Sequence, residues 1–168
     1  MAFDNIKLGF SKTAQETAIL AGSSPAAGAQ SLTHNAFNRS KTLSSGSTPA
    51  VTKIAFFEQA LTAGAATIDL TALPHNGGLV DGSGLKVQAW GVIQKAGNAA
   101  LTITAGASNG YNLLGAADGK LVLSAHASVD SEAMFFAPEG LPDVAGADKT
   151  IDLAGTGTES FYFWFALG

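Results

Sequence analysis

The chain has 168 residues, of which 46% are hydrophobic and only 13% charged, with a formal net charge of −4 and no cysteine. This length suits one domain with an appendage, and the hydrophobic share is enough to bury a core. The composition excludes disulfides and Cys-ligated metals, and the absence of a long apolar run predicts no membrane span.

Charge is unevenly divided along the chain. Residues 1–50 carry four basic and two acidic side chains, a net +2, whereas residues 51–168 carry five lysines and eleven carboxylates, a net −6. A basic segment on an acidic body is steered toward acidic partner surfaces, although a difference this small also arises by chance. The first residues, MAFDNIKLGF, lack the basic start and apolar run of a secretory signal peptide, so we expect no export.

Residues 1–50 predict an extended N-terminal arm. Residues 22–50 are rich in Ser, Ala, Gly and Thr without a strand or helix period, and such a composition does not fold alone. The capping-box spacing of Thr13 and Glu16 predicts one short helix over 13–20. A disordered tail is the alternative, but the segment contains apolar anchors that could order against another protein: Phe3, Ile6, Leu8, Phe10, Ile19, Leu20, Leu32 and Phe37.

From residue 51 onward the pattern becomes that of short strands separated by Gly, Asn and Asp turns. We expect a β-sandwich domain over 51–168, all-β and of the eight-stranded jelly-roll type, although the strand count also allows an immunoglobulin-like sandwich. In chain order, the expected strands cover 51–61, 66–73, 85–97, 100–107, 121–127, 128–140, 149–155 and 159–168. Residues 73–84 are expected to form a turn-rich connection.

The closing strand is apolar on both faces. Alternation places Phe161, Phe163 and Phe165 on one face, with Tyr162 and Trp164 on the other. A strand of this kind is central or covered on both sides, with one face in the core and the other against the arm or a neighbouring subunit. The candidate partner interface therefore comprises Phe3, Ile6, Phe10, Leu32, Phe37, Tyr162 and Trp164; the alternative is that Tyr162 and Trp164 are ordinary surface aromatics.

No constellation of residues indicates catalysis. His34, His75 and His126 lack metal-ligand spacing, and the sequence contains no nucleophile elbow, zinc-protease motif or phosphate-binding loop. The carboxylates fit turns and solvated strand faces rather than a calcium loop. We therefore expect no enzyme activity, no cofactor and no metal, and the acidic body disfavours nucleic-acid binding.

Three segments carry a resemblance to a known class of proteins. NGYNLLG (109–115), DKTIDLAGTG (148–157) and FYFWFALG (161–168) resemble small structural virion proteins of tailed bacteriophages. The resemblance implies a jelly roll that decorates or cements a capsid, binding the major capsid protein lattice and itself as a homotrimer. It also implies assembly in the host cytoplasm and a final place on the capsid surface.

Two other functions stay open. One is a different virion component, such as a head fibre, tail or baseplate protein. The other is a carbohydrate-binding β-sandwich that uses Trp90, Tyr111 or Trp164 as a platform on which a sugar stacks.

Overall fold

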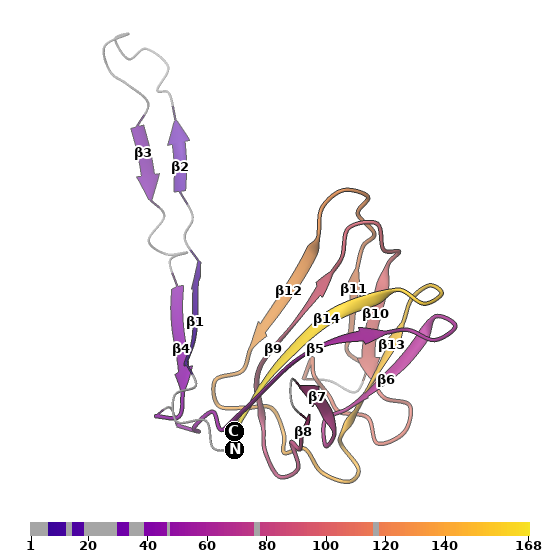
Figure 1. Cartoon of the computed structure of the whole chain (residues 1–168). Coiled ribbons are helices and arrows are strands. Elements are labelled where there is room, and N and C mark those ends of the chain that lie inside the picture. Colours follow the sequence, from indigo (N-terminus) through magenta and orange to yellow (C-terminus); the bar gives the residue numbers. More distant parts are fainter. Residues whose placement is uncertain are drawn as a thin grey trace.

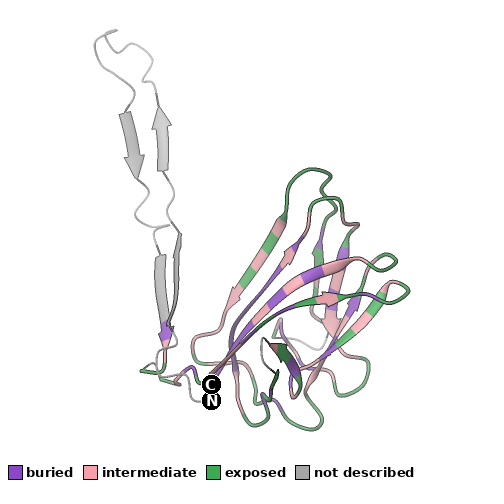
Figure 2. Ribbon diagram, in the orientation of Figure 1, coloured by how far each residue is buried: buried purple, intermediate pink, exposed green. Residues whose placement is uncertain are grey.

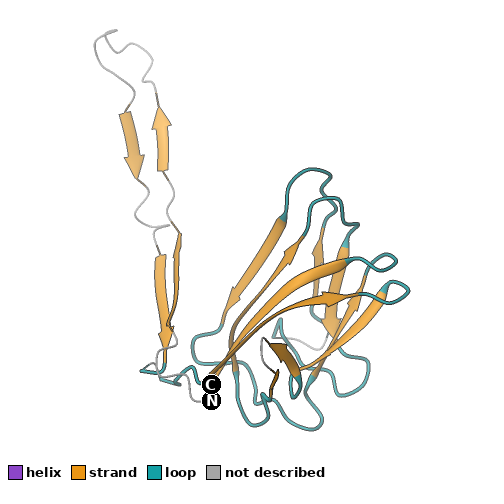
Figure 3. Ribbon diagram, viewed as in Figure 1, coloured by secondary structure: helices purple, strands orange, loops and turns teal. Residues whose placement is uncertain are grey.

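The computed structural model describes residues 7–12, 15–18, 30–33, 39–46, 48–75, 78–115 and 118–168. Within these residues every regular element is a β-strand, and the sheets are antiparallel (Figure 3). The expectation of an all-β chain is therefore confirmed. Among the described residues there is no helix of the length and apolarity needed to cross a membrane.

Residues 51–168 form a body of two four-stranded sheets that face each other (Figure 1). One sheet has the order β12-β9-β14-β5 and the other β11-β10-β13-β6. Each of the strand segments expected from the sequence overlaps one of these strands, whose bounds are β5 (Lys53–Ala60), β6 (Ala65–Asp69), β9 (Val87–Gln94), β10 (Leu101–Ala105), β11 (Lys120–Leu123), β12 (Ser131–Phe136), β13 (Thr150–Ala154) and β14 (Ser160–Leu167). The expected connection over 73–84 contains a further hairpin, β7 (Leu73–His75) and β8 (Gly78–Val80).

The core lies between the two sheets, where Figure 2 shows the buried residues of the inner strands. Side chains alternate across a strand, so β14 turns every second residue inward. Phe161, Phe163 and Phe165 are 0% exposed there, as the sequence predicted, and β10 and β13 contribute Ile103 and Leu153 from the opposite sheet. The central place of β14, between β9 and β5, explains why both of its faces are apolar.

A β-bulge interrupts the pairing of β9 with β14. Ala166 pairs with Ala89 but Leu167 pairs with Val87, so Gln88 is an extra residue on β9. A regular alternation along the expected strand 85–97 would put Val87 on the same face as Ala89, and the bulge breaks that alternation. The extra residue returns Val87 to the core face beside Leu167, whereas Ala89 packs on the opposite side of the sheet.

The N-terminal strands form two ribbons. β1 (Lys7–Lys12) pairs with β4 (Arg39–Ser44), and β2 (Gln15–Ala18) pairs with β3 (Gln30–Thr33), both antiparallel. The short helix predicted over 13–20 is wrong, because its described part is β2, where β3 supplies backbone partners in place of a helical turn. A capping box is a local signal, and this cross-strand pairing overrides it.

Candidate interaction surface

The candidate site is the outer face of the β12-β9-β14-β5 sheet, the side turned away from the core. The strand registers arrange its residues in three rows that cross the sheet. The first row contains Ile54, Ala166, Ala89 and Phe136, the middle row Phe56, Trp164, Gly91 and Met134, and the third row Glu58, Tyr162, Ile93 and Glu132.

The first row is covered by the chain itself. Leu43 at the end of β4 and Val51 pack with Ala89 and Ala166, and all four residues are at most 1% exposed. Leu43 thus belongs to the packed body although it precedes residue 51. The expected boundary at residue 50 separates Leu43 from the residues that it contacts.

The middle row is apolar and open. Phe56 is 47% exposed and Met134 is 51% exposed, although side chains this large and apolar gain by burial. Between them, Trp164 is half-buried and its indole lies across Gly91, where a Cβ atom would be 2.3 Å from Trp164 Nε1. Only a glycine at this position lets the ring lie flat on the sheet.

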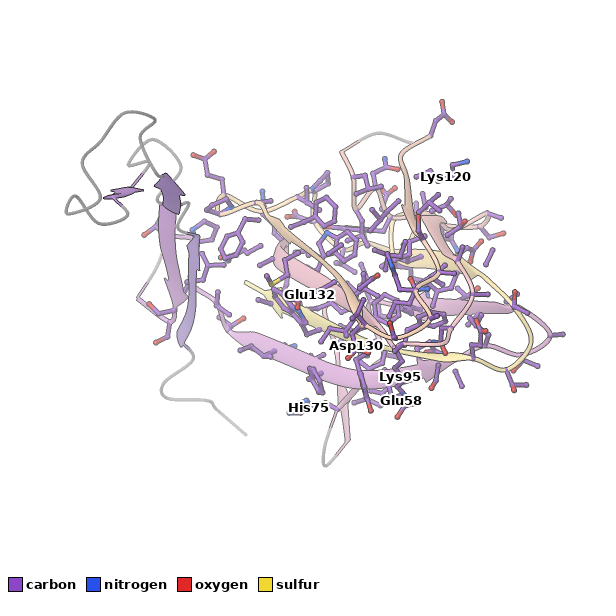
Figure 4. The ribbon with its side chains drawn as sticks, turned by 90° about the horizontal axis from the view of Figure 1, so that it is seen from above. Glu58, His75, Lys95, Lys120, Asp130 and Glu132 are labelled. Carbon is purple, nitrogen blue, oxygen red and sulfur yellow. The ribbon has the colours of Figure 1, made fainter. Side chains whose placement is uncertain are left out.

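The third row ends in a polar cluster. The Lys95 ammonium donates to Glu58 and to Ser160 Oγ, and the Ser160 hydroxyl donates to Glu58. Lys95 also lies 4.6 Å from the centre of the Tyr162 ring, which stacks on Phe56 with centroids 6.0 Å apart. Figure 4 shows Glu58 and Lys95 next to each other, with Asp130 nearby.

These contacts set the charge state of the cluster. The hydrogen bonds that Lys95 and Ser160 donate lower the pKa of Glu58, and the bond to Glu58 raises the pKa of Lys95. Both side chains are therefore charged at neutral pH. The outer face accordingly runs from a covered apolar end, through an open apolar centre, to a charged rim, which is the layout of a protein interface.

The predicted interface residues are only partly brought together. Tyr162 and Trp164 lie at the centre of the outer face. Phe10 is on β1 and Leu32 on β3, in the ribbons, whereas Phe3, Ile6 and Phe37 fall outside the described residues. Sequence reasoning did not identify Phe56 and Met134, because only the registers with β14 and β9 place them in one row.

The residues expected for sugar stacking are mostly buried. Trp90 and Tyr111 are each 1% exposed. The Trp90 ring stacks on Phe135 with centroids 4.7 Å apart, and the Tyr111 hydroxyl donates to the Pro142 carbonyl at 2.6 Å. Neither ring is available to a sugar, so Trp164 is the one candidate platform with an accessible surface.

A cleft of about 210 Å³ lies beside Trp90, at the side of the body formed by β9, β12 and residues 113–115. Its lining is mainly apolar and contains no titratable side chain. In the part of the chain that the structure describes, no three His, Asp or Glu side chains gather closely enough to hold a metal ion. The described lining of this cleft therefore offers mainly apolar contacts to a ligand.

Comparison of the chain with protein-family models, curated proteins and solved structures found no match. The functional argument therefore depends on the geometry of the outer face and on the order of the strands.

Proposed function

We propose that this protein is a structural virion protein that decorates or cements a capsid by binding the major capsid protein lattice. The order of the strands in the two large sheets supports the jelly-roll fold on which this proposal is based. When the strands of the two large sheets are numbered one to eight along the chain, the sheets read 6-3-8-1 and 5-4-7-2. This is the order of a jelly roll, an architecture used by viral capsid proteins, lectins and cupins.

The fold alone does not distinguish between these functions, so the proposal depends on the residues exposed on the outer face. The single most informative observation is the open apolar middle row of the outer face, with Phe56 and Met134 each about half exposed. An apolar strip of this kind favours a protein partner. The burial of Trp90 and Tyr111 removes two of the platforms that a lectin would use.

The low charge of the chain supports assembly into a crowded lattice. Charged residues make up 13% of the sequence, so few charges lose water when surfaces meet. Repetition of one modest contact over many equivalent sites would then produce strong attachment by avidity. The residues 1–50 would serve as an N-terminal arm in this proposal, reaching from the jelly roll to a neighbouring surface.

The proposal is tested on particles of a phage whose genome encodes this chain. Quantitative mass spectrometry of purified virions should find the chain in a copy number comparable to that of the major capsid protein. Microscopy should place it on the capsid surface. Particles lacking the gene should lose their DNA at a lower temperature, and adding the purified protein back should restore heat resistance.

Two results would redirect the proposal. A few copies per particle at one vertex would identify a tail, baseplate or head-fibre component instead. Absence from purified particles would exclude a virion role altogether. Binding to a glycan array that is lost in Trp164→Ala would then support a carbohydrate-binding module.

A further inference from the structure

Among the described residues, Leu43 and Val51 bury the first row of the outer face, whereas Phe56 and Met134 in the middle row stay about half exposed. We propose that the N-terminal ribbon of a second copy of this chain, formed by β1 and β4, lies across the middle and third rows of the outer face. The inference concerns contact between copies of the chain. It holds whether or not the assembly decorates a capsid.

The first argument is continuity with a contact that already exists. Leu43, at the end of β4, is fully buried against Ala89 and Ala166 on the same face. The residues next in line across the sheet, Phe56, Met134 and Ile93, offer the same apolar chemistry but are open or half-open. The ribbon contains further apolar residues of the kind that cover the first row, because Leu8 and Phe10 lie on β1 beside β4.

The second argument is charge. Residues 1–50 carry a net +2 and residues 51–168 a net −6. The third row presents Glu58 and Glu132 at opposite edges of the sheet, with Asp130 nearby, and Lys95 is already paired with Glu58. The basic residues of the ribbon, such as Lys12 and Arg39, which pair at its far end, would meet acidic partners there.

The third argument is size and direction. β1 and β4 have six residues each and β14 has eight, so at roughly 3.3 Å per residue the ribbon and the sheet are of comparable length. Figure 1 shows the ribbon standing clear of the body of its own chain. The exposed side chains of Phe56 and Met134 are thus accessible to the ribbon of another copy, in an exchange of identical elements.

The absence of cysteine from the chain makes a thiol-crosslinking test clean. One full-length variant, of distinguishable mass, carries Phe10→Cys on β1, and a second carries Met134→Cys. The two are mixed and oxidised. Docking raises the effective concentration of the thiols, so crosslinks between the two chains should exceed those of the control on the order of tenfold or more. The control is Val122→Cys, 48% exposed on β11 of the other sheet.

A second measurement does not depend on thiols. Phe56→Lys and Val122→Lys start from almost equal exposure, 47% and 48%. Light scattering of the full chain should show an assembly whose dissociation constant rises on the order of tenfold or more in Phe56→Lys, because a buried unpaired charge is costly. Val122→Lys should leave it unchanged, and circular dichroism checks that both variants fold.

The outcomes separate the possible occupants. Crosslinks between chains at Met134 but not at Val122 support the inference. Crosslinks that form only within one chain of the double variant Phe10→Cys/Met134→Cys would show that the ribbon folds onto its own body, which overturns it. A protein that stays monomeric at all concentrations, with crosslink yields equal to those of the Val122→Cys control, would also overturn the inference. Neither result bears on the presence of the protein in virions.

Discussion

Gly91 determines how Trp164 lies on the outer face. A Cβ atom at position 91 would be 2.3 Å from Trp164 Nε1 and 2.6 Å from Cε2, which is far inside van der Waals contact. Gly91→Ala should therefore push the indole off the sheet and lower the free energy of unfolding by about 1–3 kcal/mol. Chemical denaturation measures the loss, and the Trp fluorescence should shift toward the red as the ring becomes more exposed.

Gly146→Ala is the matched control for this change. A Cβ atom at position 146 meets no atom within 4 Å, so that variant should stay within about 0.5 kcal/mol of the wild type. Equal stability of the two variants would show that Trp164 does not need the flat site above Gly91.

Tyr111 couples the stability of the body to high pH. Burial raises its pKa to about 12 from an ordinary value of 10.0, against the opposing effect of the hydrogen bond from the Val87 backbone. The folded state holds the Tyr111 proton more tightly than the unfolded state does. The stability that follows from this difference is therefore complete below pH 10.0 and is lost as pH rises toward about 12. The free energy of unfolding should fall by about 2 kcal/mol through this window.

Tyr111→Phe tests that coupling. At neutral pH the variant should lose about 1–3 kcal/mol, because the Pro142 carbonyl and the Val87 amide lose their partner. Above pH 10.0 the difference in unfolding free energy between the wild type and Tyr111→Phe should become smaller, because the variant has no hydroxyl to ionise at this site. Denaturation curves recorded over this pH range measure the difference in unfolding free energy. A difference that stays constant would contradict the raised pKa of Tyr111.

At the scale of the element, the bulge in β9 decides which side chains reach the core. Deleting Gln88 would restore a regular ladder in which Val87 directly precedes Ala89 and stays on the core face opposite Leu167. The deletion removes the bond from Gln88 Nε2 to the Ala50 carbonyl and the bond that the Gln88 carbonyl accepts from the Ala137 amide, so it should cost about 2–4 kcal/mol.

Gln88→Ala separates these two effects, because it removes the same side-chain bond but keeps the chain length. It should cost only about 1–2 kcal/mol, clearly less than the deletion. Equal losses in denaturant titrations would mean that the side chain of Gln88, and not the backbone bond of the extra residue, accounts for the stability that the bulge contributes.

At the scale of the whole molecule, the described core lies between the two sheets of the body. Among the residues whose burial the structure describes, the main cluster begins at Ala55, and Leu43 contributes to the smaller cluster on the outer face. A chain that begins at Leu43 should therefore keep an unfolding free energy within about 1 kcal/mol of the full chain at concentrations that keep both monomeric.

Leu43→Ala in the full chain provides the contrast. It should cost about 2–5 kcal/mol, because it opens a space over Ala89 and Ala166. Calorimetry of both proteins measures the difference. If the truncation were the more damaging change, residues 1–42 would have to stabilise the folded body directly.

Part of the architecture follows from local patterns. The alternation of Phe161, Phe163 and Phe165 predicted the core face of β14, and each strand segment expected over 51–168 overlaps a strand of the body. The pairing of β1 with β4 was not predictable in this way. A ribbon is held by backbone hydrogen bonds, which leave no period in a sequence rich in Ser, Ala and Gly.

The order of the chain's residues decided that it folds as strands, which faces are apolar and where charge is scarce, because these properties depend on neighbours in the sequence. The tertiary structure alone decided that Phe56, Trp164 and Met134 lie in one row, that Leu43 covers the end of that face, and that Trp90 and Tyr111 are buried. These outcomes depend on strand order and register between segments as far apart as β5 and β14. A single inserted residue such as Gln88 changes that register without changing the composition.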